Sequence, residues 1–174
     1  VTEVTNHRVW RYDPQTKDLR VVAGVGLGGY DGDGESATAA KLNEPYEVRF
    51  DHHGHLFFVE MRNHIVRRVD AKTGVITTVA GTGEAGFGGD GGPASKAQLN
   101  RPHSIALDAT GNLFIADIGN HRIRRVDRQT GLISSIAGTG EREGPVDLQP
   151  TDGQPVLGPR ALYIVGSTLW VALR

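Results

Sequence analysis

The sequence repeats itself at a constant interval. Asn-His pairs stand at 6–7, 63–64 and 120–121, and both differences, 63 − 6 and 120 − 63, equal 57 residues. Single prolines keep the same step: Pro45, Pro102 and Pro159. A fixed period of this size predicts an array in which one supersecondary unit is stacked several times. Residues shared by the copies are therefore expected to be scaffold, and a specific function is expected where the copies differ.

Composition excludes several classes of protein. Glycine supplies 24 of the 174 residues, about twice the usual share, which suits a chain with many tight turns. The net charge of −1 gives no overall attraction to a polyanion. The absence of cysteine excludes disulfides, thiolate metal sites and a cysteine nucleophile. No apolar run reaches the roughly 20 residues of a membrane span, so no membrane partner is expected.

One repeat reads as four short strands. In the copy 103–159, β-branched and apolar residues fill 104–108, 112–117, 121–127 and 132–137, and Gly, Asn and Asp fill the turns between them. Four strands joined by short hairpins make an antiparallel meander, which is one blade of a β-propeller. The sequence therefore predicts an all-β fold of four-stranded antiparallel blades.

The connection after the fourth strand also recurs. Proline suits the first position of a helix, so Pro93 to Leu99 is expected to form a helical turn. Leu99 should then point into the gap between blades, and Leu42 and Val156 occupy the matching positions.

Three segments carry a resemblance to a known family. They are Asp-x-x-Asn-His-Arg-Ile at 117–123, Gly-Asn-Leu-Phe-Ile-Ala-Asp at 111–117 and Gly-Asp-Gly-Gly-Pro-Ala at 89–94. They look like bacterial NHL repeats, and the likeness covers essentially the whole chain, although the last copy lacks the acidic end at 167–172. The resemblance implies a β-propeller, usually six-bladed, and favours an extracellular or periplasmic location.

The expected organisation is a single propeller segment. It comprises a partial blade with its loop at 1–45, full blades at 46–102 and 103–159, and a partial blade at 160–174. A closed ring of about three blades is not expected on steric grounds, because propellers have roughly 4–8 blades. Either a longer parent chain supplies the missing blades, or two copies close a six-bladed ring as a homodimer. Light scattering distinguishes them, since the dimer has twice the 18.7 kDa mass of the chain.

Two groups of side chains suggest a metal. Asp31 and Asp33 resemble part of a calcium loop, but an EF-hand needs more carboxylates, and turn chemistry also explains Asp-Gly pairs. The equivalent His7, His64 and His121 could hold zinc. Because blades splay apart, a hairpin brace with a ring nitrogen bonded to backbone or carboxylate is the better interpretation. No cofactor is therefore expected, and calcium and zinc remain alternatives.

A basic row is predicted on the third strands. Its members are Arg11, Arg67, Arg68, Arg124 and Arg125. Some NHL propellers bind single-stranded RNA on a basic face, whereas here the arginines could instead pair with Asp70, Asp127 and other carboxylates. With no series of exposed aromatics for base stacking, nucleic acid is not the expected partner.

The copies differ where the first strand begins, and first strands line the channel of a propeller. Tyr46-Glu47, His103-Ser104 and Arg160-Ala161 are equivalent there, and Arg62 ends a second strand. The candidate ligand-binding residues at this channel mouth are Tyr46, Glu47, Arg62, His103 and Arg160. A phenol, an imidazole and a guanidinium facing one cavity suit a small polar or anionic ligand. Ordinary variation at a solvated mouth is the alternative.

The function expected from these features is a non-catalytic scaffold that binds a protein or a small ligand. Neither a Gly-x-Ser-x-Gly elbow nor a His-Glu-x-x-His helix occurs. Six-bladed relatives include lyases and lactonase-like hydrolases with a metal in the channel, so a metal-dependent enzyme is the alternative. On the first strands only Glu47 and His103 could be its ligands. RNA binding is a second alternative.

Overall fold

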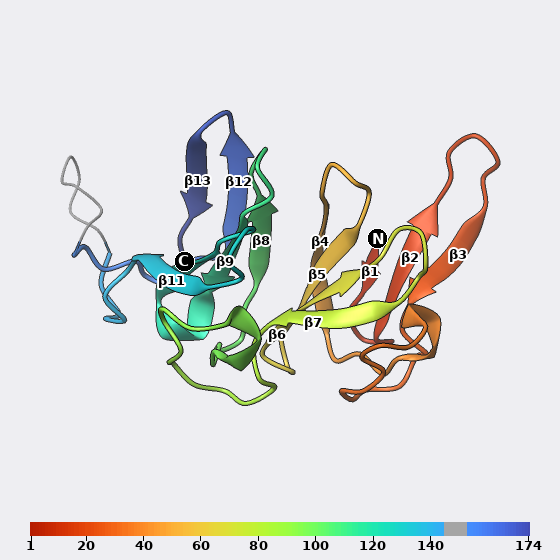
Figure 1. Cartoon of the computed structure of the whole chain (residues 1–174), viewed down its shortest axis with the longest axis horizontal. Helices are drawn as coiled ribbons and strands as arrows, with labels where there is room; N and C mark the ends of the chain where they lie inside the picture. The colour runs from red at the N-terminus through yellow and green to blue at the C-terminus, as the bar shows by residue number, and fades with distance from the viewer. Residues whose placement is uncertain (145–152) are drawn as a thin grey trace.

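The computed structural model describes residues 1–144 and 153–174, and within them the chain is all β apart from three short 3₁₀ turns. The strands form four antiparallel sheets that follow one another along the chain (Figure 1). Two sheets have four strands in chain order, as the repeat predicts. The all-β, four-stranded antiparallel architecture expected from the sequence is therefore confirmed.

The two complete sheets occupy equivalent parts of successive repeats. One contains β4 (Pro45–Phe50), β5 (Leu56–Glu60), β6 (Ile65–Val69) and β7 (Ile76–Ala80), and the next contains β8 (Ser104–Leu107), β9 (Leu113–Asp117), β10 (Arg122–Val126) and β11 (Ile133–Ala137). Within each sheet, every strand pairs with the strand that follows it in the chain. Each sheet is thus a meander in which the first strand forms one edge and the fourth the other.

Two smaller sheets flank the complete ones. The first has β1 (Thr2–Glu3), β2 (Arg8–Tyr12) and β3 (Leu19–Ala23), and the last has β12 (Ala161–Val165) and β13 (Thr168–Ala172). The hairpin β12–β13 corresponds to the first two strands of a blade, although its second strand lacks the acidic end.

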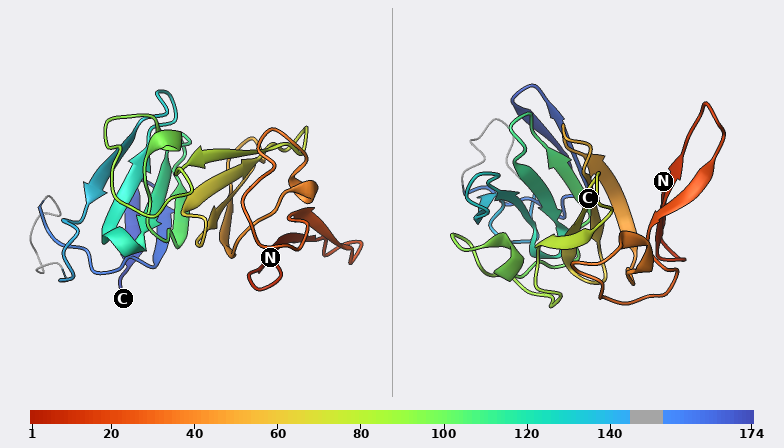
Figure 2. Two further views of the ribbon diagram at one scale, coloured as in Figure 1. Left: turned by 90° about the horizontal axis from the view of Figure 1, so that it is seen from below. Right: turned by 45° about the vertical axis from the view of Figure 1, so that its right-hand side comes forward.

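The sheets fan out as an open arc, with β1–β3 (red in Figure 2) at one end and the hairpin β12–β13 (blue) beside β8. The first strands β4, β8 and β12 lie next to one another, as they do around the axis of a propeller. The arc does not close on itself. Which blades complete it, those of a longer chain or of a second copy, stays a prediction.

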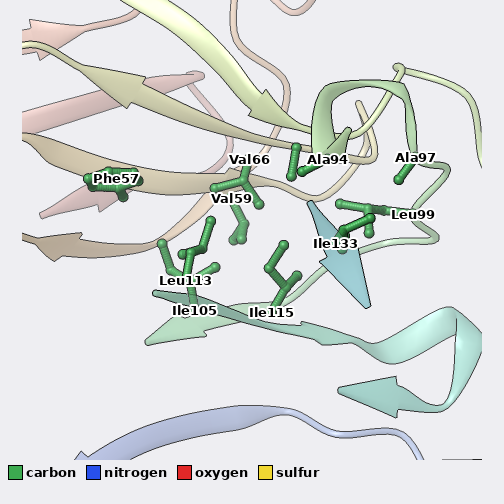
Figure 3. Packing of buried hydrophobic residues seen from close by; sticks show 11 residues of the cluster. Phe57, Val59, Val66, Ala94, Ala97, Leu99, Ile105, Leu113, Ile115 and Ile133 are labelled. Carbon is green, nitrogen blue, oxygen red and sulfur yellow. The ribbon is translucent and has the colours of Figure 1, made fainter. Parts of the chain in front are cut away.

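The core lies between the sheets rather than within them. Residues of β5, β6 and β7 pack against residues of β8, β9 and β11, and the loop between the two sheets adds Ala94, Ala97 and Leu99 (Figure 3). Leu42 and Leu99 are fully buried and Val156 is 7% exposed. Leu42 and Leu99 each belong to a cluster that joins two blades, as expected from their position in the repeat.

The connecting loops contain the predicted helical turn in a shorter form. It is a three-residue 3₁₀ helix, η1 (Ala37–Ala39) in one loop and η2 (Ala94–Lys96) in the next; a third, η3 (Ile118–Asn120), lies in the turn after β9. In the described part of the chain, no helix has the length and apolar character needed to cross a bilayer.

Candidate functional site

Clefts of two kinds are present. Grooves between neighbouring blades recur with the repeat: Thr38 and Gly74 line one, and Ser95 and Gly131, each 57 positions later, line the next. These grooves follow from the packing of equivalent blades. They are therefore part of the scaffold.

A third cleft has no repeat equivalent among the described clefts. It has a volume of about 780 Å³ and lies at the rim where first strands begin and second strands end. Its walls come from three successive blades and their loops: Tyr46, Met61, Arg101, His103, Ile118, Gly119, His121, Arg142, Leu157, Gly158, Arg160 and Arg174. We call this the rim cleft.

The structure brings three of the five candidate ligand-binding residues together in the rim cleft. The rings of Tyr46 and His103 are 4.8 Å apart between centroids, and His103 Nδ1 lies 2.9 Å from the backbone oxygen of Arg160. A carbonyl oxygen only accepts, so Nδ1 carries the proton of this hydrogen bond. Equivalent positions of three blades thus form one continuous strip of the wall.

The other two candidates lie outside the rim cleft. The carboxylate of Glu47 pairs with the guanidinium of Arg49. Arg62 Nε lies 3.0 Å from Glu44 Oε1. Both side chains are therefore engaged in ion pairs away from the wall.

Three arginines of the wall were not among the candidates. Arg101 precedes the repeat proline, Arg142 follows the fourth strand β11, and Arg174 follows β13, which corresponds to a second strand. The change from Glu44 to Arg101 to Gly158 at the position before the proline was the one available signal, because it breaks the repeat as the candidates do.

The rim cleft is held in shape by the repeated histidines. The backbone N–H of Glu44 donates to His7 Nδ1 at 3.2 Å, that of Arg101 to His64 Nδ1 at 2.9 Å, and that of Gly158 to His121 Nδ1 at 3.0 Å. Each bond joins the hairpin of one blade to the residue before the repeat proline at the start of the next blade. The predicted brace to backbone is confirmed, and it acts between blades.

Removing one brace should cost a measurable amount of stability. We expect His64→Ala to lower the free energy of unfolding by about 1 kcal/mol, the net worth of one hydrogen bond. Urea denaturation followed by circular dichroism measures the change. The exposed His53 supplies the control, since His53→Ala should stay within about 0.5 kcal/mol of the parent. An equal decrease in the free energy of unfolding of both variants would contradict a specific stabilising role for the His64 hydrogen bond.

The contribution of His64 should depend on pH. Burial and the nearby cations Arg101 and Arg62 lower the pKa of His64 below its usual value. A protonated Nδ1 cannot accept the N–H of Arg101. The folded state disfavours the protonated ring. The contribution of this hydrogen bond to the free energy of unfolding is therefore complete above about pH 6.5, the pKa of an unfolded histidine, and is lost as the pH falls through the lower pKa of the folded state. The difference between parent and His64→Ala should therefore be smaller at about pH 5 than at about pH 8, and a difference that grows toward acid pH would count against this account.

Two arginines predicted for an outer basic row are buried instead. Arg67 and Arg124 expose 0% of their surface, and each lies on a third strand that pairs in unbroken register with the second strand of its blade. Arg67 pairs with Glu60 at 3.1 Å and Asp33 at 2.9 Å, and Arg124 with Asp117 at 3.4 Å and Asp90 at 2.7 Å. The expected outer position is therefore wrong for these two residues, and the expected pairing of the arginines with carboxylates is confirmed.

The remaining arginines of that row are paired on the surface. Arg68 and Arg125 each lie 2.9 Å from the aspartate two residues later, Asp70 and Asp127. Arg11 lies 3.4 Å from Asp13. No continuous positive surface results from these residues.

Buried carboxylates complete each internal ion pair. Burial raises the pKa of Glu60 to about 7 and that of Asp117 to about 6, although the neighbouring guanidinium favours the ionised form. Glu60 also accepts the backbone N–H of Asn43 and the side-chain N–H of Asn63. Asp117 accepts the equivalent backbone N–H of Asn100 and side-chain N–H of Asn120. Recurrence of the whole arrangement identifies it as scaffold.

The first blade uses a different donor at the same place. Trp10 stands where the later copies have Arg67 and Arg124. Its Nε1–H donates to Glu3 Oε2 at 2.8 Å. The carboxylate at the end of the second strand therefore has a donor in each of the three copies.

The candidate calcium ligands are engaged by cationic groups. Asp33 Oδ1 lies 2.9 Å from Arg67 Nη2. Asp31 accepts the backbone N–H of Lys41 at 2.7 Å, and its other oxygen lies 3.3 Å from Lys41 Nζ. Across residues 1–144 and 153–174, no three His, Cys, Asp or Glu side chains gather as metal ligands would. This geometry favours a structural role for both aspartates.

Comparison with known sequences points to one kind of repeat. The model of the Teneurin NHL domain matches residues 82–154. Protein SUPPRESSOR OF QUENCHING 1, chloroplastic, from Arabidopsis thaliana is 36% identical over 106 residues, which are 61% of this chain and 10% of that protein. NHL repeat-containing protein 2 from Bos taurus is 31% identical over 123 residues, 70% of this chain and 17% of that protein. The chain thus spans a small part of these relatives.

Solved structures share the arrangement of blades. A protein of unknown function from Bacteroides thetaiotaomicron aligns with a TM-score of 0.71 at 16% identity, over 97% of this chain and 40% of that one. An auxiliary nutrient binding protein from Bacteroides ovatus gives 0.64 at 17% identity, over 93% and 39%. Virginiamycin B lyase from Staphylococcus aureus gives 0.57 at 19% identity, over 98% and 43%. At these identities the likeness concerns the fold alone.

Proposed function

Because the chain is built of NHL repeats that fold as β-propeller blades, we propose that it is a non-catalytic binding module that receives its ligand in the rim cleft. One observation carries the proposal. The rim cleft, unlike the inter-blade grooves, is walled by residues that break the repeat, among them Tyr46, His103 and Arg160. Its volume of about 780 Å³ falls in the range of small-molecule sites.

The structural neighbours include both a nutrient binding protein and a lyase. The fold alone therefore leaves binding and catalysis open. What favours binding is the chemistry of the wall, in which guanidinium groups, rings and apolar side chains predominate. Such groups recognise and orient a ligand, and none of them is a ready nucleophile.

A metal-dependent enzyme fits this wall poorly. Catalytic zinc sites use three protein ligands and an open position. The described wall residues that could bind a metal are His103 and His121, and Nδ1 of His121 already accepts the N–H of Gly158. Four neighbouring guanidinium groups would also repel a divalent cation. No catalytic step through a metal is derived for this site.

A fragment screen by ligand-observed NMR tests the proposal. The panel contains monosaccharides, amino acids, dipeptides and small lactones, and turnover of each hit is followed in the same tube. We expect hits without turnover, and we expect Tyr46→Ala and His103→Ala to weaken them about tenfold or more, the scale of losing 1.4 kcal/mol of contact. The control is Ser95→Ala, an exposed residue of an inter-blade groove. Turnover of a lactone that both cleft variants abolish would establish an enzyme instead.

A further inference from the structure

We infer that the rim cleft recognises a small ligand with two or more carboxylate or phosphate groups. The inference rests on the proposed function and names the chemical class of its ligand. Four guanidinium groups, those of Arg101, Arg142, Arg160 and Arg174, line the cleft, and its described wall contains no aspartate or glutamate. A wall with four arginines and no carboxylate side chain favours an anion.

These four arginines differ from most others in the chain. Seven arginines have a carboxylate within 4.0 Å: Arg11, Arg49, Arg62, Arg67, Arg68, Arg124 and Arg125. Arg8 and Arg122 instead donate to backbone carbonyls. In the described residues, none of the four cleft arginines has such an ion pair. Arg20 and Arg128 also lack an ion pair in the described residues, but they line two different inter-blade grooves, whereas the rim cleft gathers four such arginines in one cavity.

Backbone bonds hold two of the arginines in place before any ligand arrives. The N–H of Arg101 donates to His64 Nδ1 at 2.9 Å. Arg160 donates its N–H to the carbonyl of Ala172 at 2.8 Å, and its own carbonyl lies 2.9 Å from His103 Nδ1. The main chain at both residues is therefore fixed while the side chains stay exposed. Fixing the framework lowers the entropy cost of binding.

The geometry of a guanidinium selects the ligand group. Arginine presents a planar fork of N–H donors that matches a carboxylate or a phosphate with two parallel hydrogen bonds. Four such forks exceed the need of a single monovalent anion. The adjoining rings of Tyr46 and His103, 4.8 Å apart, offer an apolar surface to the carbon skeleton between the charged groups.

Isothermal titration of the full chain with citrate and, separately, with pyrophosphate tests the inference. We expect one or both to bind, and we expect trimethyl citrate, the neutral ester, to bind at least about tenfold more weakly. Arg101→Gln and Arg160→Gln should each reduce the affinity about tenfold or more, the value of one lost charged hydrogen-bonded pair. Arg128→Gln is the matched control, since this exposed arginine belongs to an inter-blade groove and should leave the affinity unchanged. Citrate and pyrophosphate distinguish a carboxylate ligand from a phosphate ligand.

Three results would overturn the inference. The first is no binding of either anion at millimolar concentration to protein whose circular dichroism shows it folded. The second is an equal loss in Arg128→Gln, which would indicate non-specific charge attraction. The third is tight binding of single-stranded RNA that neither small anion displaces. If neutral fragments bind in a manner that depends on Tyr46 and His103 while both anions fail, the inference falls and the proposed function stands.

Discussion

Arg124→Met should lower the free energy of unfolding by about 3–5 kcal/mol, the range for removing one partner of a buried ion pair. Arg124 is fully buried and contacts the carboxylates of Asp90 and Asp117. It also donates to the carbonyls of Gly88 and Gln98. Methionine fills part of the space but leaves Asp117 buried without a cation. Urea denaturation followed by circular dichroism measures the loss.

The control for this variant is the next residue along the strand. Arg125 is half-buried and pairs with Asp127 near the surface, so Arg125→Met should cost less than about 1 kcal/mol. Comparable losses at both positions would show that the buried network has no special weight.

The loss in Arg124→Met should also depend on pH. Burial raises the pKa of Asp117 to about 6, above its value in an unfolded chain. A group shifted in this direction contributes stability at low pH that disappears as the pH rises through the folded-state pKa. Without Arg124 the ionised form is disfavoured further, so the deficit should be larger at about pH 8 than at about pH 5. A deficit independent of pH would mean that Asp117 is not the group left unpaired.

Leu99→Ala is expected to cost about 3–5 kcal/mol, as large-to-small substitutions in a well-packed core do. Leu99 is fully buried between two blades, in the cluster that includes Val66, Ile105 and Ile133 (Figure 3). The loop that carries it is tied to both blades, so the cavity cannot close by a simple shift of the chain. Urea denaturation measures the decrease in the free energy of unfolding, provided that its dependence on urea concentration, the m-value, is the same in the variant and the parent.

Two matched leucines control that experiment. Leu132 is 41% exposed, and Leu132→Ala should cost less than about 1 kcal/mol. Leu42 is the repeat equivalent of Leu99 and is equally buried, so Leu42→Ala should resemble Leu99→Ala. A small loss at both buried sites would mean that the blades are held together chiefly by polar contacts.

Much of the fold follows from the period of the sequence. The predicted strand at 132–137 corresponds to β11 at Ile133–Ala137, and the helical turn expected from Pro93 is present as η2. These features were accessible because turn residues and apolar runs are local signals. The open arc was equally accessible from the number of strands.

The buried arginines were not accessible in the same way. Arg67 and Arg68 are adjacent on β6. Because side chains alternate along a strand, the two arginines point to opposite faces of the sheet, but the alternation does not show which face is buried. An arginine is rarely buried unless it is paired, so both were placed on the surface. The expectation that the arginines pair with carboxylates holds for both: Arg68 pairs with Asp70, and Arg67 pairs with Glu60 of another strand. The partners of Arg67, Glu60 on another strand and Asp33 in a loop, leave no local mark in the sequence around it.

The rim cleft was predicted in part. Tyr46, His103 and Arg160 were identified because they occupy one position in three repeats and differ in chemistry. Arg142 and Arg174 lie outside the strands. An alignment of the copies does not show that residues outside the strands line the rim cleft. Only the packing of three blades brings them beside the others.

The loops between blades explain why the copies tolerate no insertion or deletion over their common core. In the loop from β7 to β8, Asp90 is attached to Arg124 at one end, and Leu99 is seated in the core at the other. The backbone N–H of Gly81, at the start of the loop, bonds to the carbonyl of Ala94, and the N–H of Gly91 bonds to the carbonyl of Ile133. One added residue would withdraw either the carboxylate or the leucine from its place. A segment that looks like a long surface loop, the part of a protein where length usually varies most, is here a spacer of set length, and a glycine inserted at about residue 92 should be far less tolerated than one inserted in the hairpin turn at about residue 72.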